Sequence, residues 1–418
     1  NVIKCGSYIG NGSTDGPEIF LGFEPQWVML KNASSTGNWF MFDTMRGIVT
    51  GANDARLLAN SNNAEYTQSD GTYIDLTSTG FKLTSASSHI NGNGNTIIYC
   101  AIRRPDGYVG KPVELGTGVF AMDTGNSSST GPVYDSNFAV DWALWRQPAS
   151  SQDWRVHARL TGDKELVTNS TAAQGSRGDD ADDDFNDGWG RSTNGSYPRN
   201  SNYQSWMWKR HAGFDVVAYE GNGVAGRQVP HSLSKTPEMM WVRRRNSTNS
   251  NWWIYHKGLN GGTTPEQYGV RLNTQDDEMK LSTTWDDTAP TSTHFTVGAY
   301  NNVNGNGDDI IALLFASVDG ISKLGYYDGQ YWGHTITTGF QPRFVWIRVM
   351  NNNGPFVVLD TTRGWGSGND NYLDMSSNAA QVSASMGAPT STGFLLPDNV
   401  LSVNTNQMGR KYMYYAHA

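Results

Sequence analysis

Cysteine, charge and long apolar runs are all scarce in this sequence. Its two cysteines, Cys5 and Cys100, cannot form the disulfide framework of small secreted domains. One bond between them is possible if the first and last strands of that segment are neighbours, but we expect two buried free thiols. No apolar run approaches the ~20 residues that span a bilayer, and no signal peptide is visible. Because the chain opens with Asn1, we expect it to begin inside a longer protein or after processing.

Charged residues make up 17% of the chain, against about 25% in an ordinary globular protein. The net charge is −8, and there are no basic stripes to neutralise phosphates, which argues against nucleic acid as a partner. Catalytic motifs are missing as well: there is no G-x-S-x-G elbow, zinc-protease helix, P-loop or Cys/His metal cluster. We therefore expect no enzymatic activity, no catalytic residue and no cofactor.

What the chain has in quantity is turn residues and aromatics. Asn, Ser, Thr and Gly supply most of its polarity, and 12% of the residues are aromatic, with 15 Trp and 19 Tyr. A chain of 418 residues is too long for one hydrophobic core, so several aromatic-rich domains are expected.

An internal repeat organises the chain. Residues 22–30 reappear as residues 339–347, and the same offset of 317 carries residues 43–47 onto 360–364. Two further copies begin near residues 141 and 236, so the period is about one hundred residues. We predict four modules, of which the second is the most divergent, with the bounds 1–105, 106–212, 213–319 and 320–418.

Each copy of the repeat predicts a β-hairpin. An apolar run over residues 27–31, a polar turn over 32–38 and an aromatic run over 39–42 are typical of two paired strands. We predict an all-β fold, a tandem array of four β-sandwich modules of jelly-roll type. A propeller is the structural alternative, but its blades of about 40–50 residues need a shorter period.

An Arg-Gly pair follows the second strand of the hairpin in the first and last copies, as Arg46-Gly47 and Arg363-Gly364. We interpret it as a turn in which Gly adopts positive φ and a preceding Asp braces the Arg. The alternative is a ligand-binding Arg, but recurrence at the same place in two modules favours a scaffold role.

The longest motifs resemble a family of repeat-bearing tail and virion proteins of tailed bacteriophages, often marine ones. These motifs are residues 6–8, 22–27, 219–223, 231–233, 237–244, 252–257, 288–293 and 295–298. The resemblance covers nearly all of the chain, and the segment 106–203 departs most from the internal repeat. It implies a tail-fibre-like structural component of the virion, commonly trimeric, with no catalytic residues.

The densest acidic feature is the stretch 179–188. Asp180, Asp182 and Asp184 alternate and Asp187 follows, so their carboxylates could face one side of a loop and bind calcium. The stretch lacks the spacing and the terminal Glu of an EF-hand, and a solvated acidic loop is the favoured alternative.

Aromatic residues in Gly-, Ser- and Asn-rich stretches are candidates for ligand binding. Trp365, Trp332 and Tyr331 could offer flat apolar faces to a glycan, with local packing as the favoured alternative for each.

The leading functional hypothesis is a virion protein, assembled in the bacterial cytoplasm, that belongs to a tail fibre or similar appendage. We expect it to be a homo-oligomer, with a trimer favoured, that contacts other virion proteins and host-surface glycans and inserts into no membrane. A capsid decoration or purely architectural protein is the alternative. A polysaccharide-degrading enzyme is less favoured, although it would need only two suitably placed carboxylates.

Overall fold

The computed structural model describes residues 2–51, 54–66, 72–104, 115–176, 185–190, 200–366, 368–398 and 405–418. Antiparallel strands dominate these residues, which confirms the predicted all-β fold. The helices are single turns: α1 (Ser88–Asn91), α2 (Ser282–Trp285), α3 (Asn301–Asn304), and the 3₁₀ turns η1 (Gly116–Gly118), η2 (Arg159–Thr161), η4 (Leu259–Gly262), η5 (Pro265–Gln267) and η6 (Thr361–Arg363). None of the described helices has the length and apolar character needed to cross a membrane.

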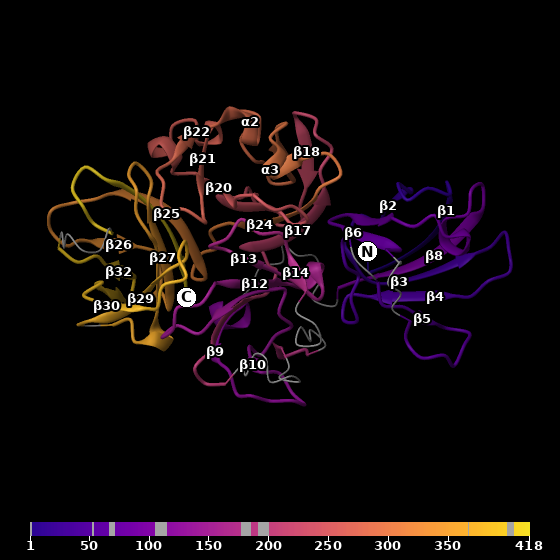
Figure 1. The fold of residues 1–418 in the computed structure, drawn as a ribbon, viewed down its shortest axis with the longest axis horizontal. Coiled ribbons are helices and arrows are strands. Elements are labelled where there is room, and N and C mark those ends of the chain that lie inside the picture. Colours follow the sequence, from indigo (N-terminus) through magenta and orange to yellow (C-terminus); the bar gives the residue numbers. More distant parts are fainter. Residues whose placement is uncertain are drawn as a thin grey trace.

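Most of the described strands lie in four large antiparallel sheets, numbered here along the chain (Figure 1). Sheet 1 has the order β1 (Ile3–Ile9), β8 (Thr96–Arg103), β3 (Pro25–Asn32), β4 (Phe40–Asp43), β5 (Leu57–Leu58). Sheet 2 has the order β9 (Phe120–Thr124), β16 (Gln204–Trp208), β11 (Trp142–Arg146), β12 (Arg155–Ala158), β13 (Lys164–Val167), β14 (Gly175–Ser176). Sheet 3 has the order β17 (Phe214–Glu220), β24 (Asp309–Phe315), β19 (Met239–Arg244), β20 (Trp253–His256), β21 (Tyr268–Arg271), β22 (Met279–Lys280). Sheet 4 has the order β25 (Ser322–Asp328), β33 (Lys411–His417), β27 (Phe344–Val349), β28 (Phe356–Asp360), β29 (Asp370–Asp374), β30 (Val382–Ala384).

A small sheet accompanies each large one. The small sheets consist of β2 (Glu18–Phe20), β7 (Gly80–Leu83) and β6 (Ile74–Thr77); β10 (Tyr134–Asp135) and β15 (Gly188–Trp189); β18 (Arg227–Pro230) and β23 (His294–Val297); β26 (Thr335–Thr337), β32 (Gly393–Leu395) and β31 (Ala388–Thr390). Each packs on one face of its large sheet, as where Tyr8 of β1 meets Phe81 of β7 with ring centroids 6.5 Å apart. We call this the inner face of the large sheet and the opposite one the outer face.

The four large sheets share one strand order. In each, the first strand of its segment pairs with the last, and the last pairs with the first strand of a hairpin. The hairpin predicted from residues 27–42 is present as β3 and β4, with Val28 opposite Phe42 and Leu30 opposite Phe40. These four side chains are buried on the inner face, whereas alternate residues of β3 point to the outer face.

The turn after this hairpin has the predicted form. The Asp43 carboxylate accepts hydrogen bonds from the backbone N–H and the Nε of Arg46, at 2.8 and 2.6 Å. Asp360 accepts the same pair of bonds from Arg363, at 2.9 and 2.7 Å. Gly47 follows with φ of 110°, a backbone conformation that glycine adopts readily. The predicted turn, with a preceding Asp that braces the Arg and a Gly at positive φ, is confirmed.

The outer faces of sheets 2, 3 and 4 meet in a shared aromatic core. Trp142 of sheet 2 lies 5.8 Å from Trp241 of sheet 3, and Trp241 lies 6.0 Å from Trp346 of sheet 4, measured between ring centroids. Trp208 of sheet 2 contacts Phe344 of sheet 4 at 5.8 Å, which closes the circle. Each of the three sheets therefore touches both of the others, and together they form a ring.

Polar contacts repeat around this ring. One arginine from the first hairpin strand of each sheet donates a hydrogen bond to a loop carbonyl of a neighbouring segment: Arg146 to Ala379 (2.8 Å), Arg243 to Ala172, and Arg348 to Asp276. The same three loops donate a backbone N–H back, as Gln174 to Arg245 (2.7 Å), Glu278 to Met350 (2.7 Å) and Gln381 to Pro148 (2.8 Å). Since the loop of sheet 2 meets sheet 3, that of sheet 3 meets sheet 4 and that of sheet 4 meets sheet 2, the contacts are cyclic.

Sheet 1 lies beside the ring and not within it (Figure 1). Its outer face is open to solvent, with Ile3 57% exposed and Ile98 38% exposed. Cys5 and Cys100 lie opposite one another on this face, on the neighbouring strands β1 and β8. Both thiols are free, but the expectation that they are buried is wrong, because Cys5 is exposed and Cys100 partly so.

Candidate functional site

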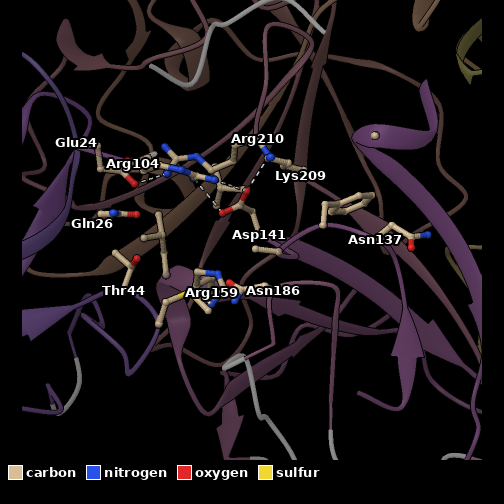
Figure 2. Close-up of a pocket in the computed structure, with 16 residues that line it drawn as sticks. Glu24, Gln26, Thr44, Arg104, Asn137, Asp141, Arg159, Asn186, Lys209 and Arg210 are labelled. Carbon is tan, nitrogen blue, oxygen red and sulfur yellow. Dashed lines mark hydrogen bonds and ion pairs between the residues drawn. The ribbon is translucent and has the colours of Figure 1, made fainter. Parts of the chain in front are cut away.

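A hollow lies where sheet 1 meets the ring. It is a cavity of about 380 Å³ (Figure 2). Glu24 and Thr44 line it from the segment of sheet 1, Asp141 from the start of β11, and Arg210 from the connection between sheets 2 and 3. Three parts of the chain that are distant in sequence therefore contribute to one site.

Asp141 is the charged centre of this site. Its carboxylate accepts two hydrogen bonds from the Arg104 guanidinium, both at 3.1 Å, and one from the backbone N–H of Arg210 at 2.8 Å. Burial by itself raises the pKa of Asp141, but the charges of Arg104 and Arg210 outweigh burial and lower this pKa to about 2. The carboxylate is thus ionised at any ordinary pH.

Arg210 joins all three parts of the site. Its guanidinium is buried and pairs with Glu24 from the segment of sheet 1 and with Asp215 of β17, the latter at 2.7 Å. Burial lowers the pKa of Arg210, but the opposing charges of Asp215 and Glu24 raise it well above its ordinary value. A buried pair of this kind is destabilised strongly when one partner is removed, so these contacts tie sheet 1 to sheet 3.

The charged side chains of the cavity connect sheet 1 to the ring, and we call this set of contacts the charged joint. Its described lining contains no Ser, Cys or His that could act as a nucleophile or base. Four cations and two carboxylates line it: Arg104, Arg159, Lys209, Arg210, Glu24 and Asp141. Arg159 is held by two hydrogen bonds to the carbonyl of Val140, at 3.1 and 2.9 Å. The site can hold modules together, and its cationic excess could attract an anionic group.

The sequence motifs alone did not reveal this site, although a signal was present. Arg104 lies two residues after Ile102, and Arg210 lies two residues after Trp208. Ile102 and Trp208 occupy corresponding places, opposite Trp27 and Trp142 in their own sheets. A cation repeated just after the last strand of two successive modules therefore marks the joint.

Most of the predicted calcium site, Asp180, Asp182 and Asp184, lies outside the described residues. Asp187 is described and exposed, and its backbone carbonyl accepts the N–H groups of Ser136 and Asn137. Within the described part of the chain, no three His, Cys, Asp or Glu side chains are grouped so that they could hold a metal ion. Calcium binding by this loop stays a prediction.

The three predicted ligand-binding aromatics lie in two different environments. Trp365 is buried and packs on Phe394 in the core of sheet 4, with ring centroids 6.3 Å apart. Its ring is closed to a ligand, so the local-packing alternative holds for Trp365. Tyr331 and Trp332 lie together at the surface, 57% and 68% exposed, with centroids 4.8 Å apart and ring planes at 82°. Glycan binding by this pair stays a prediction.

The chain matches a known family model. The model of a family described as Domain of unknown function (DUF7483) matches residues 3–104 and 119–418. No curated protein matches the chain.

Proposed function

Since the chain belongs to the DUF7483 family, whose description assigns no function, we propose from its own residues that it is a structural protein of a bacteriophage virion. The observation that carries the proposal is the closed ring of sheets 2, 3 and 4. In this ring the outer faces of the three sheets are buried against one another, and loops extend from the ring. The resemblance of the repeat motifs to phage tail and virion proteins gives this ring its setting.

The charged and aromatic residues at the centre of the molecule serve this architecture. Arg146, Arg243 and Arg348 are fully buried and hydrogen-bond loops of neighbouring segments. Asp141 and Arg210 hold sheet 1 to the ring through ion pairs with Arg104 and Glu24. Buried charged side chains, which often mark active sites in other proteins, here hold segments of the chain together. This supports a structural role over an enzymatic one.

An appendage that contacts the host is favoured over a capsid decoration by one observation. Tyr331 and Trp332 form an exposed aromatic pair at the edge of sheet 4, of the kind that stacks on sugar rings. Tail-fibre attachment to a host-surface glycan is therefore the first version of the proposal, and an architectural virion protein is the second.

The test is to locate the chain on particles. An antibody raised against the purified chain should label phage particles in electron micrographs, at a tail appendage in the first version and on the capsid in the second. If purified particles lack the chain, the proposal is wrong. Release of reducing ends from host polysaccharide by the purified chain would favour the enzymatic alternative instead.

A further inference from the structure

The outer face of sheet 1 corresponds, strand by strand, to the faces that close the ring. Met29 of β3 lies opposite Cys100 in sheet 1. The same place in sheet 3 holds Trp241 opposite Leu313. In sheet 4 it holds Trp346 opposite Tyr415. The four sheets therefore present equivalent surfaces, of which three are buried in the ring.

The outer face of sheet 1 has the apolar character of an interface, and its side chains are partly or fully exposed in the described part of the chain. Trp241 and Trp346 are about 1% exposed at the ring centre, whereas Met29 and Cys100 at the equivalent place are partly exposed. Ile3, Ile9 and Ile98 add further exposed side chains on the same face. A contiguous exposed apolar patch of this kind marks a protein–protein contact.

Sheet 1 also has counterparts of the two partners in the polar contacts of the ring, the cation and the loop whose carbonyl receives it. Lys31 lies opposite Ile98, the place that Arg348 occupies opposite Met413 in sheet 4. Strand β5 pairs with β4 in the same register in which β29 pairs with β28. This register aligns Asn63 with Ala379, whose carbonyl accepts the hydrogen bond from Arg146 in the ring. The loop around Asn63 is exposed throughout residues 59–66. A cation and a receiving loop are thus present in one module. The loop is exposed, and Lys31 is partly exposed, with its Nζ donating to the carbonyls of Asn32 (2.6 Å) and Ser35 (3.2 Å) of its own turn.

These observations identify the partner. In the ring, each module offers its cation to one neighbour and its loop to the other, so three such modules close on themselves. A set of three identical modules satisfies the same cycle, because each contains both the cation and the loop. We propose that the outer face of sheet 1 is a homotrimer interface, on which the sheet 1 modules of three copies of this chain form a second ring. The proposal does not depend on a virion role.

The residues at this face set the strength of the contact. Met29 and Cys100 take the places that Trp346 and Tyr415 fill in sheet 4, and Lys31 takes the place of Arg348. Less area is buried per residue and the lysine makes no bidentate contact, so the trimer should form reversibly with concentration.

The first experiment measures the mass of the purified full chain by sedimentation over a concentration series. The expected mass approaches three times the 45.9 kDa of one chain. Ile98→Glu places a charge on the face and should give a monomer. Phe20→Glu is the matched control, since Phe20 is 67% exposed in the same module but on the small sheet. A wild-type chain that stays monomeric or dimeric, or an Ile98→Glu chain that still forms trimers, overturns the proposal.

The second experiment tests whether the trimer uses this face. With Cys100→Ser as background, Cys5 should react with a maleimide at least about tenfold more slowly in concentrated than in dilute solution. Lys31→Arg, which restores the residue of the ring, should shift trimer formation to lower concentration. A trimer in which Cys5 stays equally reactive forms through another surface and contradicts the proposal. A trimer without any association with phage particles would uphold this inference while removing the proposed function.

Discussion

The outer face of a large sheet is buried in one region of this molecule and exposed in another. In sheets 2, 3 and 4 the outer face carries aromatic residues that are almost fully buried against the two neighbours. In sheet 1 the equivalent face carries Trp27 and smaller apolar residues such as Met29, and these side chains are partly or fully exposed. The strand order is shared, so the difference does not lie in the fold of each unit. It lies in which neighbours the chain brings to each face.

The largest expected effect separates the ring core from the open face. Trp241→Ala should lower the free energy of unfolding by about 3–5 kcal/mol, because it leaves a cavity among packed aromatic rings. Met29→Ala, at the equivalent place in sheet 1, should cost about 1 kcal/mol or less in dilute solution, where the residue is partly exposed. Denaturant unfolding of both variants measures the contrast. Equal losses would show that the two faces do not differ in burial in solution.

The second effect breaks the joint between the two regions. Asp141→Asn removes the carboxylate charge that pairs with the Arg104 guanidinium and should cost about 3 kcal/mol. The folded pKa of about 2 lies below the value of about 3.9 for an unfolded Asp. The stability from this group is therefore fully present above about pH 4 and is lost as the pH falls towards 2.

Urea unfolding at a series of pH values measures this loss. The wild type should weaken over that acid window, and Asp141→Asn should show a smaller dependence. Asp15→Asn removes an exposed carboxylate paired with Lys82 and serves as the control, with a change of about 0.5 kcal/mol or less. An unchanged acid profile in Asp141→Asn would mean that this carboxylate does not hold the joint.

A smaller effect tests the pseudo-symmetry of the ring. Trp154 Nε1 donates a hydrogen bond to the carbonyl of Asp374 at 2.8 Å. Trp252 makes the same bond to Val167 at 2.9 Å, whereas sheet 4 has Phe356 at the equivalent place. Trp154→Phe should therefore cost about 1 kcal/mol for the lost hydrogen bond plus a cavity contribution smaller than that of Trp241→Ala, because less buried volume is removed. A loss as large as that expected for Trp241→Ala would contradict the equivalence of these places.

The smallest change in stability is expected at the exposed aromatic pair. Trp332→Ala should alter the free energy of unfolding by about 0.5 kcal/mol or less, since its ring is mostly in solvent. If the pair binds a glycan, the same variant should lose retention on host cells while its unfolding midpoint stays the same. Unchanged retention would remove Tyr331 and Trp332 as the contact.

Local sequence patterns predicted the hairpins and the turns, but not the arrangement of the sheets. The apolar run from Trp27 and the Asp-Arg-Gly turn are set by strand alternation and glycine φ, which act over a few residues. Met29 and Trp346 occupy the same position in the repeat. Met29 is partly exposed and Trp346 is buried, because burial depends on segments hundreds of residues away. The charged joint at Asp141 was missed for the same reason. For Trp365, a Gly- and Ser-rich context suggested exposure, but the core of sheet 4 covers its ring.

The cyclic contacts among sheets 2, 3 and 4 have a consequence for display. A homotrimer of single modules shows every loop three times, and any change in one loop appears in all three. A ring closed within one chain holds its parts at high effective concentration and lets each module carry its own loops. The segment of sheet 2, whose sequence departs furthest from the repeat and includes the acidic stretch, can thus vary while its partners keep the ring closed.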